Sequence, residues 1–192
     1  MQLLVGSAQR PVIGETVCGD AFVVVPCENG TLVCLADGLG HGPAARVASD
    51  AACLYVEEHP ELPLEAMIRG IDQTLRGTRG AAVSIAMFSA RSLQFVGVGN
   101  VELRAVSREP IAPPTTPGIV GQGMRKVRIW EYPIAEGDLF VLMSDGISTR
   151  FDLNDLAHMG AQMLADTLLA RHHKSHDDAC CAVVRAVAAG TA

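Results

Sequence analysis

One stretch of the sequence, residues 32–42 (LVCLADGLGHG), limits the possible folds more than any other. Its first five residues are apolar without a break, which predicts a strand buried on both faces. Asp37 follows this run directly, and three glycines lie within the next five positions. An ionised carboxylate at the end of a buried strand needs a cation or several hydrogen-bond donors. The stretch therefore predicts a central strand with a polar site at its exit.

Two interpretations of this polar site are open from the stretch alone. The first is structural: a strand, a capping aspartate and a glycine turn. The second is functional: Asp37 binds a metal ion, and the glycines let a main-chain carbonyl or amide approach a ligand closely. A phosphate-binding glycine loop is disfavoured, because the Gly-Lys-Ser/Thr ending and the glycine spacing of the dinucleotide fingerprint are both absent.

Composition narrows the class of protein. A chain of 192 residues with 49% hydrophobic content predicts one well-filled domain, residues 1–192. The net charge of -6 and the lack of any basic run argue against a nucleic-acid partner. The apolar start is soon interrupted by Gly6, Ser7 and Arg10, which fits neither a signal peptide nor a membrane span. We therefore expect a cytoplasmic chain with reduced, buried cysteines and no membrane partner; the sequence leaves the oligomeric state undetermined.

A hairpin brings a second acid to the same place. Residues 20–26 and 31–36 are rich in β-forming side chains and are separated by an Asn-Gly turn signal. In an antiparallel hairpin the start of one strand lies beside the end of the next, so Asp20 should lie beside Asp37. Neighbouring carboxylates repel unless they share a cation or a proton. This pairing favours the metal interpretation.

The rest of the chain predicts helices and strands in separate blocks. Apolar periodicity predicts helices over residues 42–58, 64–75 and 154–172. Residues 81–89, 93–98 and 101–106 predict a β-meander, residues 127–132 and 138–143 a hairpin, and residues 2–8 and 179–187 single strands. The proline-rich residues 109–123 predict an ordered flap or long loop. This order, without βαβ alternation, favours an α+β fold in which helices cover an antiparallel sheet sandwich.

Four aspartates share one context in these elements. Asp20 and Asp177 stand at strand starts, and Asp37 and Asp145 stand at strand ends before a glycine. A ligand set made only of oxygen favours a hard ion such as Mg²⁺ or Mn²⁺. Two such ions, about 3.5–4 Å apart, create a hydroxide nucleophile at neutral pH and neutralise a phosphoryl group. The hypothesis that follows is metal-assisted hydrolysis of a phosphoester.

These motifs carry a family resemblance that covers nearly the whole chain. In order they are Gly19-Asp20, residues 36–42, Gly97-Val98-Gly99-Asn100, Gly137-Asp138, Ser144-Asp145-Gly146 and Asp177-Asp178. The set resembles the metal-dependent protein serine/threonine phosphatases, known as the PPM family. It is most similar to the bacterial branch of sporulation and stress-response phosphatases, and within that branch to the stressosome phosphatases.

The resemblance implies a fold and a site. The fold would be a four-layer α-β-β-α sandwich of two antiparallel sheets flanked by helices. Asp37 would bridge two Mn²⁺ or Mg²⁺ ions, and Gly38 would add its carbonyl oxygen to one of them. Asp145 and Asp177 would hold the other ion, and Asp20 would complete the site. Asp37 and Asp145 are thus the expected catalytic residues, and Ser144 and Asp178 would support them.

The resemblance also implies a reaction and a partner. Metal-bound water would attack phosphoserine or phosphothreonine directly, without a phosphoenzyme. The substrates would be phosphorylated STAS-domain proteins of the stressosome, which makes the expected role that of a feedback or resetting regulator in a stress pathway.

Two departures from the wider family leave roles open. No arginine lies near Asp20 to bind phosphate, and Leu39 stands where a proton-donating histidine is expected. His41 is either a substitute donor or a residue of the helix start. Arg125, Lys126 and Arg128 either guide a phosphoprotein or form a solvated strand edge. Two rival functions also stand: a phosphatase fold kept as an inactive binding module, and a hydrolase of small phosphate esters.

Overall fold

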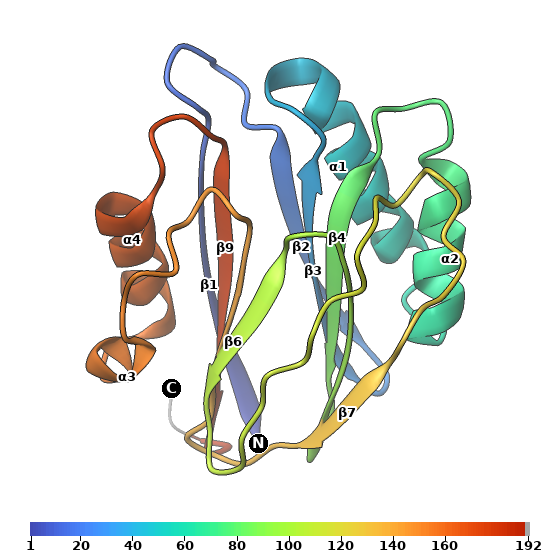
Figure 1. The fold of residues 1–192 in the computed structure, drawn as a ribbon. Helices are drawn as coiled ribbons and strands as arrows, with labels where there is room; N and C mark the ends of the chain where they lie inside the picture. The colour runs from blue at the N-terminus through green and yellow to red at the C-terminus, as the bar shows by residue number, and fades with distance from the viewer. Residues whose placement is uncertain (191–192) are drawn as a thin grey trace.

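Two antiparallel sheets face each other at the centre of the structure, and helices cover their outer sides (Figure 1). The structure is a computed structural model that describes residues 1–190. One sheet has the order β1-β9-β8-β6, made of Gln2–Arg10, Ala179–Val187, Leu139–Met143 and Glu102–Val106. The other has the order β2-β3-β4-β5-β7, made of Asp20–Cys27, Gly30–Gly38, Ala81–Phe88, Ser92–Val98 and Trp130–Pro133.

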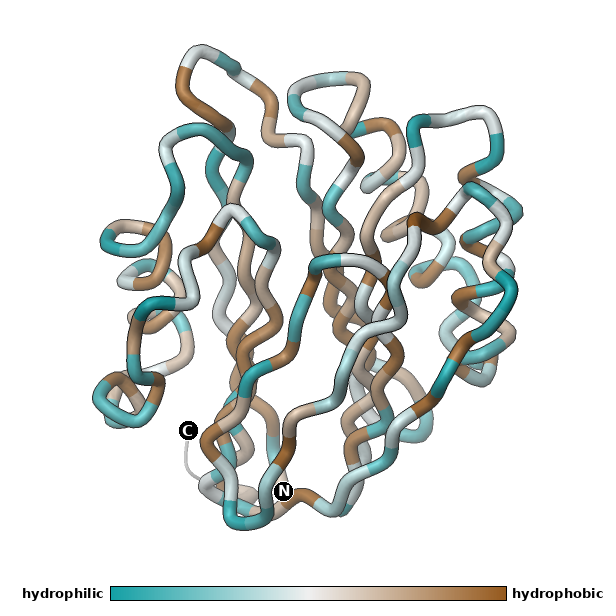
Figure 2. Tube along the Cα trace, in the orientation of Figure 1, coloured by the Kyte–Doolittle hydropathy of each residue, from teal (hydrophilic) through white to brown (hydrophobic). Residues whose placement is uncertain are grey.

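The helices form the two outer layers. Helices α1 (Gly42–Glu58) and α2 (Leu64–Thr74) lie on the five-stranded sheet, and α4 (Ala161–His172) lies on β1 and β9 of the other. Strand β3 shows why the layers form: Leu32 and Cys34 pack toward the helices, whereas Val33 and Leu35 pack between the sheets. A third apolar cluster lies under α4 (Figure 2). The expected four-layer α-β-β-α sandwich is confirmed.

The expected meander and second hairpin are wrong. Strands β4 and β5 do pair, but β6 lies in the opposite sheet beside β8. Strand β7 pairs with β5, whereas β8 pairs with β6 and β9. The chain changes sheets after Gly99, whose φ of +88° turns it away from β5. Alternating side chains predict strands well, but they do not say which neighbour covers them.

The expected helix over residues 154–172 is two helices. Helix α3 covers only Leu153–Leu156 and is capped by Asp152, whose Oδ1 accepts a hydrogen bond from the Asn154 amide at 2.9 Å. Helix α4 begins after Gly160, which has an extended backbone and so interrupts the helical path. The strand expected over residues 127–132 is also shorter and later, Trp130–Pro133.

The proline-rich segment is ordered without forming a strand, as expected. Residues 107–129 join the five-stranded sheet through single bridges, Val98 to Thr116 and Ala81 to Val120. In the described part of the chain, no helix has both the length and the apolar character needed to cross a membrane.

Candidate metal centre

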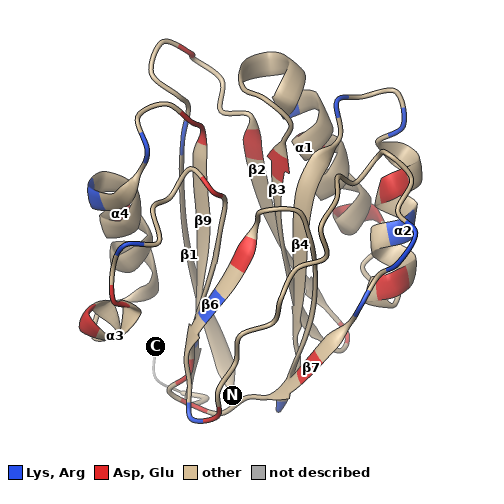
Figure 3. Ribbon diagram, viewed as in Figure 1, with Lys and Arg blue, Asp and Glu red and all other residues tan. Residues whose placement is uncertain are grey.

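Asp20 and Asp37 are direct partners in the sheet. The register of β2 and β3 pairs Asp20 with Asp37, as the Asn-Gly turn predicts. Figure 3 shows these acidic positions together at the ends of the two strands. The sequence prediction that they share one edge of the sheet is confirmed.

The opposite sheet brings Asp145 and Asp177 to the same place. Asp145 follows β8 and Asp177 precedes β9, and these two strands are paired. Asn100, which lies between β5 and β6, donates a hydrogen bond from Nδ2 to Asp145 Oδ2 at 2.6 Å. The motif containing Asn100 was apparent in the sequence, but its contact with Asp145 was not.

One cavity is lined by residues from both sheets, at the edge where these aspartates lie. Asp37, Asp145 and Asp177 line it together with Asn100 and His41, and its volume is about 290 Å³. Asp20 lies behind this cavity and is only 1% exposed. The structure therefore brings three of the predicted aspartates to a common space and places the fourth beside Asp37 in the protein interior.

The surroundings of Asp20, Asp37 and Asp177 disfavour the ionised form of their carboxyl groups. Burial, together with the charges of Asp20, Asp145 and Asp177, raises the pKa of Asp37 to about 9. Burial likewise raises the pKa of Asp20 to about 7, against a lowering effect of the hydrogen bond from Ser144. The pKa of Asp177 is raised by burial and by the neighbouring Asp145. A positive charge bound among these carboxyl groups would therefore stabilise their ionised form.

The donor set fits divalent ions. Within residues 1–190, no Lys or Arg forms an ion pair with any of these four aspartates. In the same part of the chain, no three acidic, histidine or cysteine side chains already stand as close as in an occupied metal site. Uncompensated carboxylates repel one another and so stand apart when no cation lies between them. Carboxylate oxygens from two sheets are ligands that suit Mg²⁺ or Mn²⁺.

Ser144 and Asp178 hold the surroundings of these acids. Ser144 Oγ donates a hydrogen bond to Asp20 Oδ2 at 2.7 Å. The two carboxylate oxygens of Asp178 accept hydrogen bonds from the backbone amides of Val12 at 2.8 Å and Gly19 at 2.7 Å. Asp178 thereby ties the loop before β2 to the start of β9, which keeps Asp20 in register with the opposite sheet.

Gly38 has a packing role that the structure makes visible. A Cβ at this position would overlap the backbone carbonyl of Ala45 in α1. The absence of a side chain therefore lets α1 approach β3 next to Asp37. The expected use of the Gly38 carbonyl as a metal ligand stays a prediction.

His41 lines the cavity, and Arg79 lies next to Gly40, another residue of its lining. His41 is the residue before α1, and its Nδ1 lies 3.0 Å from Glu15 Oε1 with 62% of the side chain exposed. The guanidinium of Arg79 lies beside Gly40, where it would contact an added Cβ at 2.7 Å. The sequence offers no arginine next to Asp20, but the fold brings this one to the glycine turn from the loop after α2.

Asp72 is a polar residue that sequence reasoning missed. It is 6% exposed, and its carboxylate accepts hydrogen bonds from the amides of Gly121, Gly123 and Met124 at 2.7, 3.2 and 3.3 Å. The signal was present, because Asp72 falls on the apolar face of its helix, four residues after Ile68. A buried acid on such a face needs donors, and here the proline-rich segment supplies them.

The comparisons with known proteins agree with this fold. The family model described as Stage II sporulation protein E (SpoIIE) matches residues 28–192, so the chain belongs to the SpoIIE family. Among curated proteins it is similar to phosphoserine phosphatase RsbX of Bacillus subtilis (strain 168), with 29% identity over 139 residues and 70% of each chain covered. The expected resemblance to the bacterial sporulation and stress branch is confirmed.

Solved structures share this fold. A chain solved as part of "The bacterial stressosome: a modular system that has been adapted to control secondary messenger signaling" has a TM-score of 0.92 and 32% identity, covering 96% of this chain and 100% of that one. RsbX in complex with magnesium has a TM-score of 0.84 and 23% identity, covering 95% and 94%. The catalytic domain of the serine/threonine phosphatase PstP, with two manganese ions, has a TM-score of 0.79 and 15% identity, covering 97% and 99%.

Proposed function

We propose that this protein is a metal-dependent protein serine/threonine phosphatase. The observation that carries the proposal is the convergence of four aspartates from two sheets, with raised pKa values for Asp20, Asp37 and Asp177 and, within residues 1–190, no cationic partner. Membership of the SpoIIE family and similarity to a phosphoserine phosphatase support it. Residues 1–192 act as one catalytic domain in this proposal.

Each aspartate has a role in the proposed site. Asp37 lies near the acids of both sheets and would hold both ions. Asp145 and Asp177 would hold one ion from the opposite sheet, and Asp20 would add its charge beside Asp37. The Gly38 carbonyl is the remaining proposed ligand. Two bound Mg²⁺ or Mn²⁺ ions supply an activated water and positive charge for the phosphoryl oxygens. Asn100 orients Asp145 through its 2.6 Å hydrogen bond.

The proposed substrates are phosphorylated STAS-domain proteins of a stressosome, in the cytoplasm. Similarity to RsbX and to a chain from stressosome work supports this context. Removal of phosphoserine or phosphothreonine from such proteins would return the pathway to its starting state. The protein would then be a feedback or resetting regulator of stress signalling.

The two rival functions are distinguishable from this one. An inactive binding module need not keep acids whose charges destabilise the empty site, whereas this chain keeps all four. A hydrolase of small phosphate esters uses the same carboxylates, so only the choice of substrate separates it from a protein phosphatase.

The experiment is phosphate release from phosphorylated STAS-domain proteins, with Mn²⁺, with Mg²⁺ and with chelator, beside a small aryl phosphate. Metal-dependent turnover that strongly favours the phosphoproteins is the expected result. Turnover of the aryl phosphate alone would keep the metal chemistry and reject the protein substrates. No turnover with either metal would favour the binding module.

A further inference from the structure

A second cavity lies next to the carboxylate cavity and shares two lining residues with it. Its volume is about 490 Å³, and Val98, Met124, Arg125 and Lys126 are among the residues that line it. Gly118 and Ile119 line both cavities, so the two cavities lie against the same short stretch of the chain. We call the second cavity the flanking groove. A peptide whose phosphoserine reaches the aspartates can therefore extend into it.

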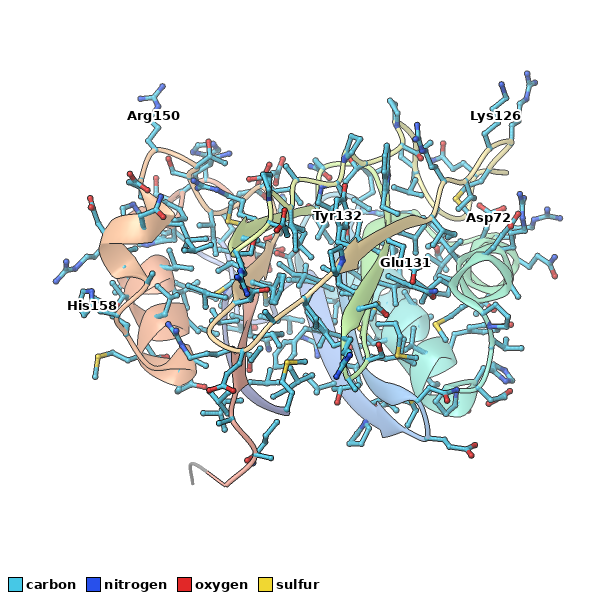
Figure 4. The ribbon with its side chains drawn as sticks, turned by 90° about the horizontal axis from the view of Figure 1, so that it is seen from below. Asp72, Lys126, Glu131, Tyr132, Arg150 and His158 are labelled. Atoms are coloured by element: carbon cyan, nitrogen blue, oxygen red, sulfur yellow. The ribbon has the colours of Figure 1, made fainter. Side chains whose placement is uncertain are left out.

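Asp72 anchors the segment of the chain, residues 121–126, that carries the two cations of the flanking groove. The buried carboxylate of Asp72 accepts the amides of Gly121, Gly123 and Met124, immediately before Arg125 and Lys126. The Ala81 to Val120 bridge holds the same segment against β4. Figure 4 shows Lys126 projecting outward on the side of the molecule where Asp72 lies. These contacts hold the backbone just before the two cations in a defined position along the flanking groove.

Arg125 and Lys126, the two cations of the flanking groove, are available to bind a ligand. Neither Arg125 nor Lys126 pairs with a carboxylate in the part of the chain that the structure describes, and both are exposed. Arg128 differs, because its guanidinium lies 3.6 Å from the centre of the Trp130 ring. Figure 3 shows basic positions on the segment before β7 and acidic ones at the strand ends. In a chain of net charge -6, Arg125 and Lys126 give the flanking groove two positive charges.

We propose that the flanking groove binds acidic residues next to the phosphoserine of the protein substrate. The inference rests on the proposed phosphatase function and adds a sequence preference to it. The net negative charge of the protein disfavours an acidic phosphosegment, and Arg125 and Lys126 compensate for this at the point where the segment leaves the site. Val98 and Met124 give the groove an apolar part that accommodates a side chain of the same segment.

The test compares phosphoserine peptides that differ only in charge. One set carries Asp or Glu within four residues of the phosphoserine, on either side, and the matched set carries Asn or Gln. The double variant Arg125→Ala/Lys126→Ala is compared with wild type and with Arg91→Ala/Arg108→Ala. This control removes the same charge from exposed positions that line neither the carboxylate cavity nor the flanking groove.

We expect wild type to prefer an acidic peptide, and the Arg125/Lys126 double variant to lower kcat/KM for that peptide about five- to tenfold at low ionic strength. The effect should shrink in high salt, because exposed charges are screened. Neutral peptides and a small aryl phosphate should be hydrolysed equally well by the double variant and wild type. The Arg91/Arg108 control should behave as wild type with every substrate.

Failure of the inference and failure of the proposed function give different results. Equal kcat/KM for acidic and neutral peptides, with metal-dependent turnover intact, overturns the groove alone. Absence of turnover with every phosphoester overturns the phosphatase proposal. In that case, fluorescence anisotropy of a labelled acidic peptide still tests the groove, which is refuted if the Arg125/Lys126 variant binds as wild type does.

Discussion

Asp37 is the residue on which the negative charges of both sheets act. Its partner in the sheet is Asp20, and the charges of Asp145 and Asp177 also raise its pKa. A carboxylate in this position is the group best placed to share ions between the two sheets. Its replacement is therefore the most direct test of the proposed centre.

We expect Asp37→Asn to lower kcat at least about a hundredfold while the protein stays folded, because the amide keeps the volume and removes the charge. Steady-state kinetics with a phosphoprotein, and circular dichroism for the fold, measure the two effects. Asp155→Asn, at an exposed position of α3, is the matched control and should be fully active. Normal turnover by Asp37→Asn would refute the assignment.

His41 is expected to be dispensable for proton transfer. Its side chain is largely exposed and its Nδ1 lies 3.0 Å from Glu15. A general acid contributes about 10²–10⁴-fold to the rate, whereas we expect His41→Ala to change kcat less than about threefold. The pH profiles of kcat for wild type and variant decide the matter. Loss of one limb of the profile would instead make His41 the proton donor.

The junction of β3 and α1 is the element that most closely controls the site. Gly38 lets α1 pack against the strand that carries Asp37, and a methyl group there would overlap the Ala45 carbonyl. We expect Gly38→Ala to lower the free energy of unfolding by about 1–3 kcal/mol and to reduce activity, because α1 must move. Denaturant unfolding measures the first effect.

Gly160 offers a matched control for this prediction. It also lies beside a helix, at the start of α4, but a Cβ there would meet no atom within 4 Å. Gly160→Ala should therefore unfold close to the wild-type midpoint. Equal destabilisation by both substitutions would mean that the contact with Ala45 is not the cause.

Asp72 links α2 to the proline-rich segment. Its two carboxylate oxygens accept three amide hydrogen bonds, and an asparagine side chain would replace one of these oxygens with a nitrogen that only donates. We expect Asp72→Asn to lower the free energy of unfolding by about 1–3 kcal/mol. It should also reduce the preference for acidic phosphopeptides while turnover of the aryl phosphate persists. If the folded variant keeps the full preference for acidic phosphopeptides, Asp72 does not position the flanking groove.

Across the molecule, the carboxylates make stability depend on pH and metal together. The folded-state pKa of Asp20 is raised from 3.8 to about 7, and that of Asp37 from 3.8 to about 9. A raised pKa contributes stability that is complete below the unfolded value and is lost as pH rises through the folded value. In chelator, this contribution should therefore fall between about pH 4 and about pH 9.

Thermal unfolding across this pH range, with and without Mn²⁺, measures the effect. We expect the ion to raise the midpoint more at pH 9 than at pH 5, because it binds the ionised acids and not the unfolded chain. In chelator at pH 9, Asp37→Asn should be at least as stable as wild type. An equal gain from Mn²⁺ at both pH values would count against a carboxylate site.

The local parts of this protein follow from its amino-acid order alone. An unbroken apolar run at residues 32–36 specified a strand buried on both faces, and an Asn-Gly turn set Asp20 opposite Asp37. Both are short-range effects, because burial period and turn geometry act within a few residues. The resemblance to the phosphatase family predicted the four-layer sandwich and the metal-binding roles of the aspartates.

The choice of which strands share a sheet became visible only in the folded chain. The alternation of apolar and polar side chains along a strand does not depend on which strand pairs with it. For this reason the sequence predicted the wrong partners for β6 and β7. The same holds for Asp72, whose amide donors come from a segment about fifty residues away. Contacts of this kind depend on which distant surfaces bury each other's apolar faces, and no local pattern contains that choice.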